Sequence, residues 1–336
     1  MNGQSECEYY RAAEHSLDCG EVLQDATLGY LTFGELNAAR NNAVIIPTHF
    51  GGTHEHSQYF FGEGMAIDPA KHFIVVVNLL GNGISSSPSH GLGGEFPRIT
   101  ICDNVRLQHQ LLTEHLNVSE LALAVGHSMG AVQAFHWVTM YPDFVKHFAA
   151  ICGAARISIH NHVFLEGMRG ILQSDPVWDG GRYTEQPING LATMARAWGA
   201  WPPSSHFYRH EYYKRLGFTS ADDFLTRYWE AFYTQMDANN VLAQITTWQS
   251  ADITRCNGSS QTFEQALQSI KARGVVMPSR TDAYFPPEDS ELEVANLQNA
   301  KLRVIESQWG HWAGSGRNPE DTTYIDHQIS SLLADE

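Results

Sequence analysis

The sequence predicts an α/β protein in which helices cover both faces of a mostly parallel, doubly wound sheet. Short strand-like runs alternate with helical stretches along most of the 336 residues. Several of these runs, such as Ile74–Val77 and Leu121–Val125, are apolar throughout. Continuous apolar strands are typical of a parallel sheet that is buried on both faces. The strand–helix order therefore predicts the doubly wound class.

The individual elements follow from the same patterns. We expect strands at Thr27–Phe33, Ala43–His49, His72–Leu80, Leu121–Val125, Phe148–Gly153, Gly274–Ser279 and Lys301–Ser307. Helical patterns between these strands lie at Cys102–Leu116, Ala131–Met140 and Pro287–Leu297. The alternation of strand and helix stops near residue 156 and resumes at residue 274.

The interrupting stretch, residues 156–273, predicts a helical lid. It contains helical patterns at Ser220–Phe232 and Asn239–Trp248, no strand pattern, and most of the eight Trp. Residues 1–155 and 274–336 are then the core. Because ligands of open α/β sheets bind at the carboxyl ends of the strands, we expect the lid to cover that edge. A helical decoration remote from any site is the alternative.

Composition excludes several classes of function. Lys and Arg number 21 against 37 Asp and Glu, which gives a formal charge of −16, and no basic cluster occurs. A nucleic-acid partner or an anionic membrane surface is therefore not expected. The apolar runs are shorter than a membrane span, and the polar segment Met1–Arg11 does not resemble a signal peptide.

Cysteine usage predicts neither a disulfide framework nor a structural zinc site. The five Cys are odd in number, scattered and never in CxxC spacing: Cys7, Cys19, Cys102, Cys152 and Cys256. The 17 His contain no HExxH pattern. We therefore expect no metal, no cofactor and a reducing cytoplasmic location.

The strongest local signal is the sequence G-x-S-x-G at Gly126–Gly130. It follows the strand Leu121–Val125 and opens the helix Ala131–Met140, the context in which this motif forms a nucleophile elbow. Side chains at 126 or 130 would clash with neighbouring backbone, so both positions require Gly. The motif predicts Ser128 as a nucleophile; the alternative is a tight turn in which Ser128 only caps the helix.

A serine nucleophile needs a base and an acid that orients the base. In the α/β-hydrolase fold these follow in the order Ser, Asp or Glu, His. Asp282 comes after the strand Gly274–Ser279, and His311 comes after the strand Lys301–Ser307. We therefore predict Asp282 as the orienting acid and His311 as the base.

Other residues could compete for these roles. Glu288 and Asp289 follow two Pro at a helix start, where acidic residues usually complement the helix dipole. His327 lies in a late helical pattern and is expected at the surface. For the oxyanion hole we predict the backbone N–H groups of Gly51 and Met129, because Gly51 permits close approach to a substrate oxygen.

With these residues in place, the sequence resembles the homoserine O-acetyltransferase family of α/β-hydrolases from about Leu28 to Leu333. The stretches that carry the resemblance are Gly34–Asn37, Asn41–Val44, Gly64–Asp68, Val77–Gly81, Phe96–Asp103, Ser128–Gly130 with Gln133 and Trp137, Asp175–Tyr183, Gly190–Arg196 and Met236–Asn239. The resemblance implies the same triad, a helical lid that forms a tunnel to the serine, and a homodimer joined through lid helices.

The sequence also departs from the family pattern. The transferases carry GGSMGG at the elbow, whereas this chain has His127 and Ala131. They carry an Asp after the catalytic His, which helps to hold the amino group of homoserine, and here that position is Trp312. The transferases also carry a Tyr shortly after an Arg in the lid. Arg196 aligns with that Arg, but the position of the Tyr falls near Pro202–Pro203 in this chain.

With these departures, Phe50, Trp198, Trp201 and Trp312 predict a more apolar substrate pocket. The resemblance also places Arg196 in this pocket. A pocket without its polar partners loses recognition of a polar substrate. We therefore expect an esterase branch of the family, a serine carboxylesterase that acts on small acetate-type esters. The alternative is an acyl-CoA-dependent O-acyltransferase, which would share the acyl-enzyme. A non-catalytic ligand-binding protein is the third hypothesis.

Overall fold

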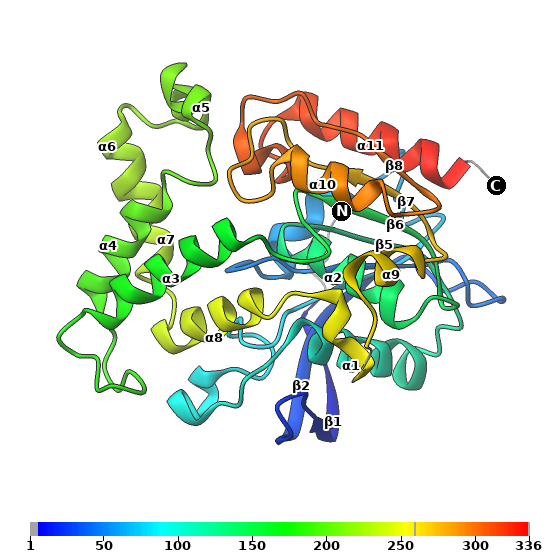
Figure 1. Ribbon diagram of the computed structural model, residues 1–336, viewed down its shortest axis with the longest axis horizontal. Coiled ribbons are helices and arrows are strands. Elements are labelled where there is room, and N and C mark those ends of the chain that lie inside the picture. The colour runs from blue at the N-terminus through cyan, green and yellow to red at the C-terminus, as the bar shows by residue number, and fades with distance from the viewer. Residues whose placement is uncertain (1–5, 259, 335–336) are drawn as a thin grey trace.

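The computed structural model describes residues 6–258 and 260–334, and its core is an eight-stranded sheet (Figure 1). The strands are β1 (Glu8–Ser16), β2 (Val22–Phe33), β3 (Ala43–Pro47), β4 (Phe73–Val77), β5 (Leu121–His127), β6 (Val145–Ile151), β7 (Arg273–Met277) and β8 (Ala300–Leu302). Their order across the sheet is β1-β2-β4-β3-β5-β6-β7-β8. β2 pairs antiparallel with β1 and β4, and the other neighbours pair in parallel. The predicted mostly parallel α/β sheet is confirmed.

The centre of the sheet is covered on both faces. All five residues of β3 are buried, and successive side chains of a strand point to opposite faces. The same holds for the last four residues of β4. These are the apolar runs that predicted a doubly covered sheet, and their carboxyl ends form the edge that carries the site.

β1 is a strand that the sequence pattern did not reveal. It forms a long antiparallel hairpin with β2 at the edge of the sheet, and most of its side chains are exposed or half-buried. Its sequence, EYYRAAEHS, mixes polar and apolar residues because an edge strand needs no continuous apolar face.

The helices are α1 (Ile101–Gln110), α2 (Met129–Met140), α3 (Ile159–Gln173), α4 (Ile188–Trp198), α5 (Ser205–Arg209), α6 (Ala221–Phe224), α7 (Ala231–Tyr233), α8 (Ala238–Gln249), α9 (Phe263–Gln268), α10 (Pro287–Val294) and α11 (Pro319–Ala334). α2 packs against β3, β5 and β6, and it also contacts α1. The expected helix Ser220–Phe232 runs through α6 and α7, with the π-helical segment Leu225–Glu230 between them. α2, which begins directly after Ser128, therefore lies at the centre of the fold.

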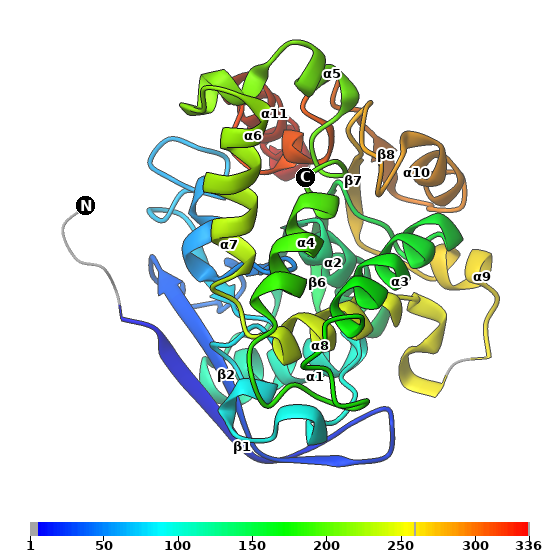
Figure 2. The same cartoon turned by 90° about the vertical axis from the view of Figure 1, so that its left-hand side faces the viewer.

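The lid is formed by α3 to α8, which lie on the side of the molecule that faces the viewer in Figure 2. A narrow neck connects it to the core, where Arg156 and Asp252 form an antiparallel bridge. The N–H of Ile157 donates to the Ala251 carbonyl, and the N–H of Ile253 donates to the Ala155 carbonyl. The helical cap thus closes at residue 252, earlier than the expected boundary at 273, because the 3₁₀ segment Ile253–Gly258 already packs against α2.

A disulfide joins Cys102 of α1 to Cys256 of the segment Ile253–Gly258. The expectation that the cysteines form no disulfide is therefore wrong for this pair. The two residues are 154 positions apart, so no local sequence pattern predicts that they are in contact. Cys7, Cys19 and Cys152 are free.

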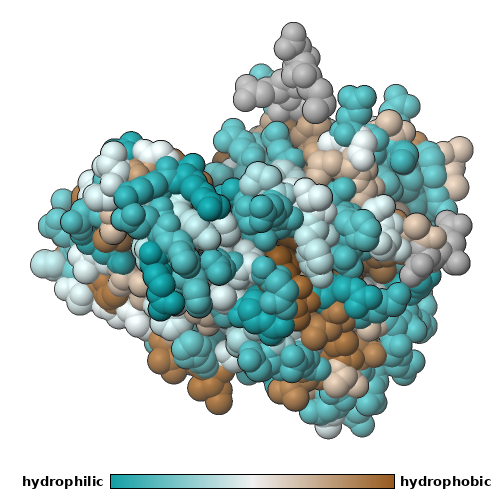
Figure 3. Space-filling model, turned by 90° about the horizontal axis from the view of Figure 1, so that it is seen from above, coloured by the Kyte–Doolittle hydropathy of each residue, from teal (hydrophilic) through white to brown (hydrophobic). Residues whose placement is uncertain are grey.

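The outer surface is mainly hydrophilic on the face shown in Figure 3, where hydrophobic side chains form only small patches. Among the described residues, no helix has both the length and the apolar character that a bilayer span requires.

Candidate active site

Ser128 lies in a strained turn between β5 and α2. Its backbone has φ 58° and ψ −127°, in a region that residues other than Gly rarely adopt. A Cβ at Gly126 would lie 2.3 Å from the carbonyl carbon of Gly130, and one at Gly130 would lie 2.5 Å from the Pro47 carbonyl oxygen. The predicted need for Gly at both positions is confirmed. The turn holds Ser128 at the carboxyl edge of the sheet.

Asp282 and His311 form a buried hydrogen-bonded pair. His311 Nδ1 donates to Asp282 Oδ2 at 2.7 Å, and both residues are about 5% exposed. The other carboxylate oxygen of Asp282 accepts the N–H groups of Tyr284 and Phe285 at 2.8 and 3.3 Å. These contacts fix the carboxylate and leave Nε2 of His311 as the nitrogen that can accept a proton.

The loop that carries His311 is held by the lid. The N–H of His311 donates to the Pro202 carbonyl at 2.8 Å. Gly310 has φ 68°, and a Cβ there would approach the same carbonyl oxygen to 2.4 Å. Only Gly therefore fits beside the lid at this position.

Ser128 and His311 line one cavity of about 360 Å³. Within the described residues, Ser128 Oγ makes no hydrogen bond to His311. Catalytic hydrogen bonds are often long in the absence of substrate and tighten when it binds. The predicted nucleophile and the predicted base therefore border the same cavity.

Aromatic side chains from the lid and the core enclose this cavity. Phe50 stacks on Trp198 with ring centroids 4.8 Å apart, and Trp312 stacks on Trp229 at 5.4 Å. The other Phe, Tyr and Trp side chains that line the cavity are Tyr228, Phe232, Tyr233, Trp248 and Tyr284. Phe50 and Trp312 thus lie where the sequence predicted them, in an apolar pocket.

The loop after β3 differs from the expected oxyanion hole. The N–H of Gly51 donates to Oε1 of Gln244 on α8 at 2.9 Å, so it is not free to meet a substrate oxygen. Among the described residues, the N–H groups of Phe50 and Met129 have no hydrogen-bond acceptor. Gln244 lies 193 positions from Gly51, and a sequence pattern could not reveal this contact.

Arg196 does not line the cavity, in contrast to the prediction. The buried face of α4 carries Leu191, Met194 and Trp198, whereas Arg196 is half-exposed and pairs with Glu230. The rival catalytic residues are also elsewhere. Glu288 and Asp289 lie in the first turn of α10, and His327 lies on α11.

Arg317 is a cavity residue that the sequence analysis missed. Its guanidinium lies 4.5 Å from the ring of Trp312, and it donates to the hydroxyl of Tyr228. Among the described residues, Arg317 has no carboxylate partner. It follows Gly316 in a short loop and belongs to no motif, so only the structure shows that a cation faces the pocket.

Two further His residues lie behind the catalytic pair. His127 Nε2 donates to the His311 carbonyl at 2.9 Å, and its ring lies 4.5 Å from that of His311. Burial lowers the pKa of His127 well below its usual range. Burial, together with the nearby His56 and Arg317, also lowers the pKa of His49 to about 3. Both rings are therefore neutral near pH 7.

Among the described residues, two groups of side chains have the composition of a metal site. His127, Cys152 and His311 form one, within the active site. There the Nε2 of His127 is already hydrogen-bonded, and burial raises the pKa of Cys152 well above its usual range, so its thiol stays protonated. A protonated thiol is a poor ligand. The other group, Cys102, His136 and Cys256, lies outside the active site.

The profile of the alpha/beta hydrolase fold family matches residues 42–315. The chain belongs to this family. An ethyl acetate hydrolase from Pseudomonas veronii is 36% identical over 325 residues, which cover 95% of this chain and 93% of that protein. A homoserine O-acetyltransferase from Nostoc punctiforme is 32% identical over 323 residues, or 90% of each chain.

The solved structure of the acetyl esterase MekB is also closely similar. It superposes with a TM-score of 0.94 at 36% identity and covers 98% of this chain and 97% of its own. The family resemblance inferred from the sequence, with both esterases and transferases among the relatives, is confirmed.

Proposed function

We propose that this α/β-hydrolase is a serine carboxylesterase that hydrolyses small acetate-type esters through an acyl-enzyme on Ser128. The observation that carries the proposal is the cavity itself, where Ser128 in a strained elbow and the Asp282–His311 pair share an aromatic pocket. The similarity to an ethyl acetate hydrolase over nearly the whole chain supports it.

The geometry supports the following reaction. Nε2 of His311 takes the proton of Ser128 Oγ as this oxygen attacks the ester carbonyl carbon. The N–H groups of Met129 and Phe50 then stabilise the tetrahedral oxyanion, because the N–H of Gly51 is engaged by Gln244. Collapse breaks the ester bond, and the alcohol leaves with the proton from His311. A water molecule deprotonated by His311 attacks the acyl-serine carbonyl carbon. The bond to Ser128 Oγ then breaks, His311 returns the proton to this oxygen, and acetic acid leaves.

The lining of the cavity favours water over an amino-alcohol acceptor. Among its described residues there is no Asp or Glu, so the ammonium group of homoserine would find no ion-pair partner. Arg317 would repel that group, and Trp312 occupies the space beside the base. An unmatched charge in such a pocket opposes binding strongly.

Acyl transfer from acyl-CoA is the second candidate function. The observation in its favour is Arg317, an unpaired cation that could hold a carboxylate of the acceptor. The two candidates share the acyl-enzyme and differ in the nucleophile that attacks it.

A substrate panel distinguishes them. Purified enzyme is supplied with ethyl, propyl and p-nitrophenyl acetate, and separately with acetyl-CoA and L-homoserine, with Ser128→Ala as the control. We expect rapid ester hydrolysis, no preference for homoserine over water, and a loss of several orders of magnitude in the variant. Formation of O-acetylhomoserine faster than hydrolysis of any simple acetate would replace the esterase proposal with the transferase.

We further propose a homodimer joined through lid helices. Ile159 and Val163, one turn apart on α3, are 84% and 62% exposed, and Ile188 at the start of α4 is 52% exposed. Sedimentation equilibrium should show a dimer for the wild type and a monomer for Ile159→Glu/Val163→Glu. Leu292→Glu, at an exposed apolar position on α10, is the matched control and should remain dimeric. A monomeric wild type would contradict the proposal.

We also propose that the chain works in the cytoplasm. The support is its three free cysteines, because unpaired thiols are typical of reducing compartments. Acid quenching of the cells, followed by alkylation under denaturing conditions with a chelator and by peptide mass spectrometry, tests the location, because Cys102 and Cys256 are both buried in the folded chain. Alkylated Cys102 and Cys256 would support it, and a fully formed disulfide between them would contradict it.

A further inference from the structure

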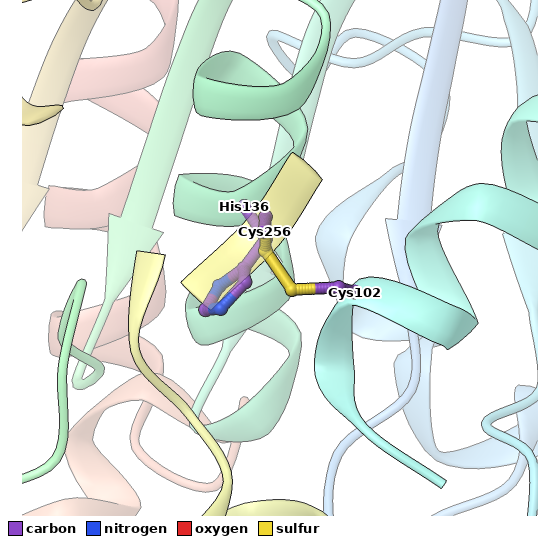
Figure 4. Close-up of side chains that lie close together, drawn as sticks. All are labelled: Cys102, His136 and Cys256. Atoms are coloured by element: carbon purple, nitrogen blue, oxygen red, sulfur yellow. A yellow bond between two sulfur atoms is a disulfide. The ribbon is translucent and has the colours of Figure 1, made fainter. Parts of the chain in front are cut away.

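Outside the active site, three side chains from distant segments meet in the interior. Cys102 comes from α1, His136 from α2 and Cys256 from the segment Ile253–Gly258 (Figure 4). One ligand-type atom from each lies within 4.8 Å of the others. All three residues are at most 3% exposed. The cluster is therefore a closed group of two sulfurs and one imidazole.

The imidazole of His136 is oriented in a way that the disulfide does not explain. Nδ1 donates to the Val132 carbonyl at 2.8 Å, so the neutral ring carries its lone pair on Nε2. Among the described residues, Nε2 is buried and has no hydrogen-bond partner. The backbone of Asp252 lies near the ring but makes no well-aligned hydrogen bond with it. A buried nitrogen with a free lone pair points to a ligand.

The donor set fits a soft divalent cation. Zinc binds thiolate sulfur at about 2.3 Å and imidazole nitrogen at about 2.0 Å, which separates tetrahedral ligands by about 3.5–3.8 Å. The Cα atoms of Cys102 and Cys256 are 5.7 Å apart, so two unlinked thiolates can reach one ion without a backbone shift. A ligating His usually donates its other N–H to a carbonyl, as His136 does to Val132.

We propose that Cys102, His136 and Cys256 form a redox-controlled site for a zinc-type cation. In the reduced chain, two thiolates and Nε2 of His136 bind Zn²⁺, a water molecule completes the coordination, and two thiol protons are released. In the oxidised chain, the sulfurs share their disulfide bond and cannot bind the ion. Reduction of the disulfide needs two electrons and two protons, which two molecules of a small thiol supply as they are joined in a disulfide of their own.

The placement of the site gives it a structural role. Both the ion and the disulfide tie the segment Ile253–Gly258, which follows the lid, to α1 and α2 of the core. His136 lies two turns after Ser128 on α2, about 12 Å along the helix axis. In either redox state, the cluster therefore holds the segment that leaves the lid against the core. It takes no part in the reaction at Ser128.

Cobalt binding tests the site with a spectroscopic readout. The full-length protein is reduced, freed of reductant under anaerobic conditions and titrated with Co²⁺, and Zn²⁺ is then added as a competitor. We expect one tightly bound Co²⁺ per chain with thiolate-to-cobalt charge-transfer absorption, which Zn²⁺ removes. The oxidised protein should lack this absorption. Cys19→Ser, which removes an exposed thiol elsewhere, should bind like the wild type.

Variants and footprinting complete the test. Cys102→Ser/Cys256→Ser gives the baseline for adventitious binding to the other His residues, and His136→Gln should weaken Co²⁺ binding at least tenfold. Alkylation of the reduced wild type, which depends on no variant, should show that Zn²⁺ protects Cys102 and Cys256 but leaves Cys19 reactive. The proposal is overturned if the reduced wild type binds no more Co²⁺ than the double variant, if His136→Gln binds equally well, or if Zn²⁺ leaves both thiols unprotected.

Discussion

Arg317 sets the charge of the substrate pocket. It lies over the ring of Trp312 and has no carboxylate partner among the described residues, whereas the rest of the lining is aromatic or neutral. At roughly 8 Å and an effective dielectric constant of about 20, two unit charges interact by about 2 kcal/mol. A single uncompensated guanidinium can therefore decide between substrates of equal shape.

The corresponding prediction compares acetylcholine with its uncharged carbon isostere, dimethylbutyl acetate. The enzyme should hydrolyse the neutral ester with a kcat/KM at least tenfold higher, because Arg317 repels the quaternary ammonium group. Arg317→Gln should reduce this discrimination severalfold. Arg227→Gln, a lid arginine outside the cavity, is the matched control and should leave the ratio unchanged. Equal rates for the two esters in the wild type would contradict this account of Arg317.

At the scale of residues, the sequence could predict the groups that belong to a motif. Ser128 is marked by its flanking Gly, and Asp282 and His311 by their places after late strands. Arg317 belongs to no sequence motif. Only the family resemblance places Arg196 in the pocket. Whether a long side chain faces a cavity depends on the rotation of its helix or loop, which packing sets.

At the scale of elements, α8 supports the loop after β3. Its Gln244 accepts the N–H of Gly51 and thereby fixes the neighbouring N–H of Phe50 in the proposed oxyanion hole. Gln244→Met keeps the size of the side chain but removes the acceptor. We expect kcat for ethyl acetate to fall about tenfold or more with little change in KM, because the oxyanion donor loses its position.

A variant on the same helix provides the control for this prediction. Gln249→Met removes a side chain that pairs with Arg169 and Glu166 outside the cavity, and it should leave kcat unchanged. An unchanged kcat in Gln244→Met would show that the loop needs no support from α8. A rise in kcat would instead assign the oxyanion hole to the freed N–H of Gly51.

α10 carries a buried carboxyl at the neck of the lid. Glu293 Oε1 accepts the N–H of Ala155 at 2.7 Å, whereas Oε2 has no partner among the described residues. Burial, with a smaller contribution from Asp289, raises the pKa of Glu293 to about 8, against the opposing effects of the Ala155 N–H and of Arg156. The folded chain therefore holds a proton that the unfolded chain releases near pH 4.5.

This difference in proton binding gives a pH dependence of stability. As pH rises from about 4.5 to 8, Glu293 should lower the free energy of unfolding by up to about 1.4 kcal/mol per pH unit. Glu293→Gln keeps the acceptor for Ala155 and should gain stability over the wild type across this window. Urea unfolding at pH 5 and pH 8 measures the difference, with the exposed Glu291→Gln as control. If the difference in stability between Glu293→Gln and the wild type were the same at pH 5 and pH 8, the raised pKa of Glu293 would be wrong.

The boundaries of elements were harder to predict than their existence. The expected strand Lys301–Ser307 is ordered as β8 only over Ala300–Leu302, although Ile305 still forms a bridge to Ser279. The neck of the lid closes at Arg156 and Asp252 because two backbone segments pair there. Such pairings between distant residues, like the disulfide Cys102–Cys256, leave no local pattern in the sequence.

At the scale of the whole molecule, the architecture follows from apolar patterning. β3, β4 and β5 are buried on both faces because their runs are apolar throughout, and this fixes the parallel sheet and its carboxyl edge. The sequence could thus predict the core, the lid and the catalytic edge, whereas the shape and charge of the pocket depend on packing between the two.

Ser128, activated by His311, is the proposed nucleophile of this α/β-hydrolase. Labelling with a fluorophosphonate, followed by peptide mass spectrometry, tests this assignment most directly. We expect one label per chain, on Ser128, in proportion to the loss of ethyl acetate hydrolysis, and much slower labelling of His311→Ala. A label on another residue, or continued ester hydrolysis after Ser128 is fully labelled, would contradict it.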